Sequence, residues 1–182
     1  MKRWEFNGEE KNVFGITLKQ IRATDRFTLK CGITIEAGEN GGWIEGEKNL
    51  SDNAWVSDNA RVYGDAQVFG NAWVSDNAQV FGNARVSGNA RVFGNARVSG
   101  DAHYFQIGPA GSRNDYTTFT RNKAGTIFVS CGCFYGTIDE FRERVKKTHG
   151  DNKHAKVYLT AADLAELQID TIPIEDEPKE ET

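Results

Sequence analysis

A bulky apolar residue returns at every sixth position between residues 44 and 104, and a small alanine stands two positions before each central valine. A period of six fits neither the 3.6-residue turn of an α-helix nor the alternation of a simple strand. Each unit is therefore predicted to be one short strand followed by one corner. The apolar positions are Ile44, Leu50, Val56, Val62, Val68, Val74, Val80, Val86, Val92, Val98 and Tyr104.

Strand geometry gives each unit an inner and an outer side. Residues two apart point the same way, so Ala72 and Val74 face inward while Trp73 and Ser75 face outward. The Gly-Asn and Asp-Asn pairs between units tolerate the left-handed backbone that a sharp corner needs. Three such corners close a triangular coil of about 18 residues, and stacked coils bury a core that a single coil cannot.

Two further features carry a resemblance to known families. The stretch Val68–Trp73 has an aliphatic residue first and a small residue fifth, which resembles the hexapeptide repeat of left-handed parallel β-helices. The left-handed sense is implied by that resemblance alone. Segments Gly15–Ala23, Asp25–Phe27 and Gly41–Glu45 resemble the start of YdcK-like hexapeptide-repeat proteins of bacteria and their phages. This second resemblance implies a fold and a cap, but no activity.

The chain is predicted to have four parts, and its fold class is mainly β. Residues 1–43 hold strand-like runs separated by turns at Asn7-Gly8 and 38–42, and form a β cap over the first coil. Residues 44–104 form a left-handed parallel β-helix of about three to four triangular coils. Residues 105–168 form a small α+β module. Residues 169–182 form an acidic tail that is expected to be disordered.

The α+β module is predicted to be a ββαα unit. Ile107–Gly111 is typical of a turn, and strands are predicted at 115–121 and 126–134. Alternation places Cys131 and Cys133 on the same strand face as Ile127 and Val129, and Phe134 on the opposite face.

Helices follow these strands. Thr137 and Glu140 form a capping box that opens an amphipathic helix ending near His149-Gly150, and a second helix covers about 153–167. The sheet is expected to pack under the helices and against the last coil.

Composition narrows the functional classes. No apolar run approaches the length of a membrane span, and the charged start lacks the apolar region of a secretory signal. The odd set Cys31, Cys131 and Cys133 favours a reducing cytoplasm over a disulfide framework. Of the net charge of -4, residues 170–182 contribute six acidic side chains and one lysine. The remainder is nearly neutral, so nucleic acid is not an expected partner.

Aromatic side chains stack on the predicted outer faces, because positions 18 apart share a face. Such a patch favours an interface between copies of the chain, as a dimer or trimer, or with another protein. The alternative is that aromatic rings of successive coils stack on one another within the chain, which only stiffens the β-helix. The predicted interface residues are Trp55, Trp73, Arg91, Phe93, Tyr63 and Phe81.

The densest polar stretch lies between Gly111 and Tyr116. A flexible turn, a forked guanidinium and nearby hydroxyls are the groups that anion or nucleotide recognition uses. The predicted ligand-binding residues are Ser112, Arg113, Asn114 and Tyr116.

No metal, cofactor or catalytic residue is predicted. Zinc is bound by the residue types found at Cys131, Cys133, His149 and His154. However, only one residue separates the two cysteines on a predicted strand, whereas zinc-binding cysteines are usually separated by two to four residues. Many relatives of the β-helix are acyltransferases with a catalytic histidine in a cleft between subunits. Here His103 is the only histidine of the repeats, and no extruded loop interrupts them.

Segments within 111–152 resemble a C-terminal module of phage and prophage proteins of unknown role, which implies a phage-linked origin. The expected function is a non-catalytic oligomeric binding scaffold in the cytoplasm of a bacterial host. Its partners would be itself and a host protein, for example an antiviral-defence component that it inhibits. The alternatives are a sequestering protein for a nucleotide-like ligand and a hexapeptide-repeat acyltransferase.

Overall fold

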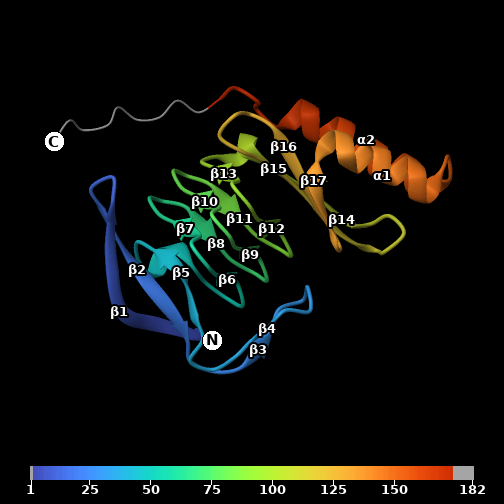
Figure 1. Ribbon diagram of the computed structural model, residues 1–182. Helices are drawn as coiled ribbons and strands as arrows, with labels where there is room; N and C mark the ends of the chain where they lie inside the picture. Colours follow the sequence, from blue (N-terminus) through green and yellow to red (C-terminus); the bar gives the residue numbers. More distant parts are fainter. Residues whose placement is uncertain (1, 174–182) are drawn as a thin grey trace.

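The computed structural model describes residues 2–173 and has a triangular β-solenoid of about three turns at its centre (Figure 1). Each rung is a two-residue strand, as the period of six predicts. The rungs are β6 (Trp55–Val56), β7 (Arg61–Val62), β8 (Gln67–Val68), β9 (Trp73–Val74), β10 (Gln79–Val80), β11 (Arg85–Val86), β12 (Arg91–Val92) and β13 (Arg97–Val98).

Rungs three units apart pair in parallel. Val62 pairs with Val80, and Val80 pairs with Val98, so the coil is 18 residues long. The three faces of the solenoid are β7-β10-β13, β8-β11 and β6-β9-β12. Every inward alanine and valine from Ala60 to Val92 is fully buried. Burying one such valine contributes roughly 1.5–3 kcal/mol, so the repeated pair supplies the core.

The corners have the left-handed backbone that the sequence predicts, with positive φ at Gly70 and Asp76 among others. They also carry a ladder that the sequence analysis missed. Asp52 Oδ2 accepts a hydrogen bond from Gly70 N at 3.0 Å, and Asp76 Oδ2 accepts one from Gly94 N at 2.8 Å. A carboxylate in one coil therefore binds the corner amide of the next coil.

The N-terminal part continues one solenoid face. Strands β1 (Trp4–Val13) and β2 (Ile16–Ala23) form a hairpin, and β2 pairs antiparallel with β5 (Asn40–Ile44), which pairs parallel with β7. The turn predicted at Asn7-Gly8 is wrong, because the pair lies at a bulge within β1 and the hairpin turns at Phe14-Gly15.

Between β2 and β5 the chain makes an excursion with two short strands, β3 (Phe27–Thr28) and β4 (Thr34–Ile35). Leu29 and Ile35 of this excursion are buried in the solenoid core cluster. A 3-10 turn, η1 (Glu47–Asn49), follows β5.

The C-terminal module is a four-stranded antiparallel sheet with two helices. After η2 (Asp101–His103) come β14 (Tyr104–Ala110), β15 (Asp115–Arg121), β16 (Ile127–Cys131) and β17 (Phe134–Thr137), in that spatial order. The predicted turn at 107–111 is wrong, because β14 runs through it and pairs with β15. Helix α1 (Ile138–His149) opens with the predicted capping box, and α2 (Lys153–Gln168) follows.

The sheet lies between the helices and the last coil (Figure 1). Phe119 contacts Phe141 of α1 at 6.0 Å between ring centroids, while Thr118 Oγ1 on the other face accepts a hydrogen bond from Arg91 N. Phe134 contacts Phe141 as well, so its predicted placement is wrong. The turn at Gly132-Cys133 lets Cys131 pair with Phe134, which puts both on the helix-facing side.

The start of the predicted tail is packed. Ile169 is buried, and Asp170 N donates to Ala102 O at 2.7 Å. The Arg121 guanidinium donates to the carbonyls of Asp170 and Ile172. The expected disorder is therefore wrong for residues 169–173, and residues 174–182 lie outside the described residues.

Candidate ligand-binding site

Of the six residues of the predicted aromatic interface, only Trp55 is buried within the chain, and the other five are partly exposed. Trp55 is fully buried, with Phe27 of the excursion at 5.7 Å between ring centroids. Phe93 lies between Trp73, at 4.7 Å, and Tyr135 of the module, at 6.0 Å. The expectation that Trp55 faces solvent is wrong, because a repeat pattern sets the direction of a side chain but not which segment covers it.

Arg91 joins three parts of the chain. Its Nη1 donates to Gly132 O at 2.8 Å in the module, and its Nη2 lies 3.5 Å from Cys31 O in the excursion. Together with the bond from Arg91 N to Thr118 Oγ1, these contacts hold the module against the solenoid.

Tyr63 and Phe81 stack one coil apart, with ring centroids 5.3 Å apart and planes at 9°. Both rings are partly exposed, and Tyr63 Oη donates to Gln79 Oε1 at 3.3 Å. This geometry is the cross-rung stacking that was the alternative to an interface. Binding of a second chain at these residues stays a prediction.

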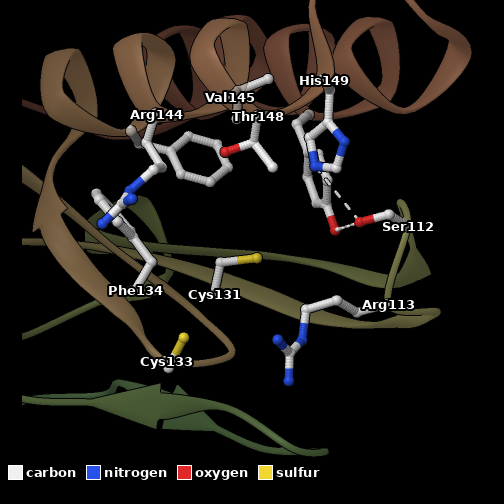
Figure 2. A pocket seen from close by; sticks show the side chains of 11 residues that line it. Ser112, Arg113, Cys131, Cys133, Phe134, Arg144, Val145, Thr148 and His149 are labelled. Carbon is white, nitrogen blue, oxygen red and sulfur yellow. Dashed lines mark hydrogen bonds between the residues drawn. The ribbon is translucent and has the colours of Figure 1, made fainter.

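A cavity of about 310 Å³ opens between the sheet and the helices of the module (Figure 2). One wall is apolar and consists of Phe134 with Phe141 and Val145 of α1. The polar lining comes from separate elements, so only the folded module assembles it. These polar residues are Ser112, Arg113, Arg144, Thr148, His149 and Tyr158.

The two guanidiniums are the charged groups of the cavity. Arg144 projects from α1 beside Phe134, and Arg113 lies near Cys133 (Figure 2). Neither side chain makes a hydrogen bond or an ion pair with another residue among 2–173. Both cations are thus free to bind an anion from solution.

Hydroxyl and imidazole groups meet at the end of the cavity that holds Arg113, away from Arg144 (Figure 2). Ser112 Oγ lies 3.4 Å from His149 Nε2 and 3.5 Å from Tyr158 Oη (Figure 2). Both distances are at the long limit for hydrogen bonds, so a ligand can compete for these groups at little cost. Gly111 lets the loop approach Tyr158, because a Cβ there would lie 2.1 Å from the ring and φ is +70°.

The structure places the predicted ligand-binding residues in two different places, and their binding of a ligand stays a prediction. Ser112 and Arg113 line the cavity, whereas Asn114 and Tyr116 do not. Tyr116 lines a separate cleft of about 160 Å³ with Arg91. Arg144 and Thr148 of α1 were not predicted from the sequence as cavity residues. The only signal was their spacing of three and four along α1, which puts them on the same side as the predicted core residues.

Two thiols lie at the same cavity. Cys131 Sγ accepts a hydrogen bond from Thr117 Oγ1 at 3.2 Å, and Cys133 is exposed in the turn after β16. The expectation that Cys133 continues the buried strand face is wrong. Within residues 2–173, no three His, Cys, Asp or Glu side chains are grouped as metal ligands.

His103 is engaged by its own surroundings. Its Nδ1 accepts from Ser99 N at 3.1 Å and lies 2.8 Å from Ser99 Oγ and 3.4 Å from Arg121 Nη2. Burial, and then the charge of Arg121, lower the pKa of His103.

The solenoid matches a known repeat. Residues 54–68, 78–92 and 90–104 match the YdcK β-solenoid repeat family. The chain carries YdcK β-solenoid repeats. No curated protein matches the chain significantly. None of the helices within residues 2–173 is long and apolar enough to cross a membrane. The YdcK repeats thus account for the central part, while the cavity belongs to the module that follows them.

Proposed function

We propose that the chain is a non-catalytic binding protein whose C-terminal module holds a small anionic ligand with a planar ring, such as a nucleotide. The observation that carries the proposal is that two unpaired guanidiniums, one at each end, and an aromatic wall line one cavity. This function corresponds to the sequestering protein that the sequence analysis gave as an alternative.

Each part of the cavity suits one part of such a ligand. Arg113 and Arg144 offer planar forks that bind phosphate or carboxylate oxygens through paired hydrogen bonds. Phe134 and Phe141 give an apolar surface for a ring. Ser112, His149 and Tyr158 offer donors and acceptors at the end of the cavity away from Arg144. The volume of about 310 Å³ is at the lower end for small-molecule sites, which favours a ligand of mononucleotide size.

The solenoid serves as a rigid support in this proposal. Arg91 bonds the carbonyl of Gly132, which lies between the two cysteines of the cavity. The position of the β16–β17 turn is therefore tied to the last coil. Oligomerisation, a host-protein partner, inhibition of host defence, a phage origin and a cytoplasmic location remain predictions from the sequence.

Native mass spectrometry of the chain purified gently from bacteria tests the proposal. We expect a surplus of a nucleotide-sized mass on each 20.2 kDa chain, and its loss in Arg144→Ala. Arg85→Ala is the matched control, since Arg85 is exposed on the solenoid, lies over the ring of Phe69 and does not line the cavity. Equal surplus in both variants would place the ligand elsewhere and reject this site.

A further inference from the structure

The outer side of α2 carries exposed apolar side chains. Val157 is 39% exposed, Leu164 is 44% exposed and Leu167 is 86% exposed. In contrast, Ala161 and Ala165 of the same helix are fully buried in the module. Helix α2 thus contributes three of the six large apolar residues that are exposed within residues 2–173, which is unusual for a surface that only meets water.

These side chains form one stripe along the helix. Positions three, four and seven apart share a side of an α-helix, so Val157, Thr160, Leu164 and Leu167 lie in line. We call these four residues the α2 outer stripe. The buried residues of α2 occupy the opposite side of the helix, and the helices cover the side of the sheet that is turned away from the solenoid (Figure 1). The stripe therefore faces away from the rest of residues 2–173.

Charges of opposite sign flank the stripe. Lys156 and Asp163 are seven residues apart, so they stand on the same side of the stripe, about 10 Å from each other along the helix. Asp163 accepts a hydrogen bond from Arg142 Nη2 at 2.7 Å, yet its side chain is 66% exposed. Glu166 binds the same guanidinium with both carboxylate oxygens, at 2.6 and 2.8 Å. Asp163 can therefore pair with a second cation while Arg142 keeps its partner.

The order of these charges selects a second copy of α2 that runs in the opposite direction. In that arrangement Lys156 of each chain comes opposite Asp163 of the other, and Val157 comes opposite Leu164. The twofold axis then passes near Thr160. A copy that ran in the same direction would place lysine beside lysine and aspartate beside aspartate, which is unfavourable.

We propose that the α2 outer stripe is a self-association surface, through which two copies of the chain pair their α2 helices antiparallel. This surface is separate from the aromatic faces of the solenoid, where the sequence predicts oligomerisation, and it does not depend on the ligand of the module. A helix of 16 residues is about 24 Å long, so the interface is small for a protein pair. The dimer is therefore weak, with a Kd of about 10–100 μM.

Sedimentation equilibrium of the full chain tests the proposal. We expect a monomer at about 1 μM and a dimer at about 500 μM, as this Kd implies. Leu164→Glu should weaken association about tenfold or more, because it buries a carboxylate in the apolar contact. Phe14→Glu is the matched control, since Phe14 is 67% exposed between β1 and β2 and is not part of the stripe. It should associate like the unmodified chain.

Two results of this experiment would overturn the proposal. The first is an unmodified chain that stays monomeric at about 500 μM, which would leave the stripe to another protein. The second is a dimer that forms equally well in Leu164→Glu, which would assign self-association to another surface.

Exchanged charges test the antiparallel arrangement and separate association from folding. Lys156→Asp leaves two acids beside the stripe, and Asp163→Lys leaves two lysines. Each variant alone should associate about tenfold more weakly, because like charges then face each other. An equimolar mixture of the two variants should form a heterodimer about as tight as the unmodified dimer, because each contact again joins opposite charges. A mixture that associates no better than either variant alone would overturn the antiparallel pairing.

Discussion

The guanidinium of Arg91 donates a hydrogen bond to Gly132 O over 2.8 Å. One partner belongs to the solenoid, and the other lies between the two cysteines at the cavity of the module. This contact links the repeats to the proposed ligand site.

Arg91→Ala should destabilise the chain by about 2 kcal/mol, because hydrogen bonds from a charged donor contribute roughly that much. It should also weaken ligand binding, because the β16–β17 turn loses its support. Urea unfolding and calorimetric titration measure the two effects. Arg85→Ala, with a comparable change in charge, should alter stability by less than about 0.5 kcal/mol. Equal effects of the two substitutions would contradict a linking role for Arg91.

Trp55 should behave as a core residue and not as an interface residue. Trp55→Ala should cost about 3–5 kcal/mol, because it empties a large fully buried site. Trp55→Phe should cost much less, since Nε1 has no hydrogen-bond partner among the described residues and its loss leaves nothing unpaired. Thermal unfolding ranks the two variants. A dimer that dissociates in Trp55→Phe without loss of stability would restore the interface interpretation.

Gly111→Ala should distort the cavity. The new Cβ would lie 2.1 Å from the Tyr158 ring, and φ of +70° is strained for alanine. We expect a loss of more than about 1 kcal/mol in stability together with weaker ligand binding. Gly46→Ala is the control, because its φ is extended and a Cβ added there would meet no atom within 4 Å. Unchanged binding in Gly111→Ala would argue that the loop does not shape the site.

His103 should make the chain less stable in mild acid. Its pKa is lowered in the folded state, so below the ordinary value near 6.5 the unfolded chain binds more protons and is favoured. Stability should therefore rise between about pH 5 and pH 7 and then level off as far as this group is concerned. Urea midpoints at several pH values test this. His103→Gln should flatten that rise, and an unchanged rise in this variant would assign it to other groups.

The repeat core follows from local pattern alone. Ala60 and Val62 are inward because spacing sets their direction, and Asp76 adopts its corner conformation by itself. The helix start at Thr137 is equally local. Strand β14 was not predictable in this way, because Pro109 and its glycine neighbours are typical of turns and only pairing with β15 makes the segment a strand.

The cavity was predictable only from its loop. Ser112 and Arg113 share a polar stretch, whereas Arg144 comes from a helix that packs on the sheet of the folded module. The burial of Trp55 likewise depends on Phe27, which reaches it from the excursion. Contacts between segments far apart in the chain determine both features, and no local pattern encodes them.

Isothermal titration of the intact chain with nucleoside mono- and diphosphates, and with the corresponding uncharged nucleosides, tests the ligand site most directly. We expect binding of at least one phosphate compound, at least tenfold weaker binding of its nucleoside, and a 10- to 100-fold loss in Arg144→Ala, as about 1.4–2.8 kcal/mol per lost contact implies. Arg85→Ala should bind like the unmodified chain. Binding that is equally tight in Arg144→Ala, or no binding of any anionic ring compound, would contradict the proposed function.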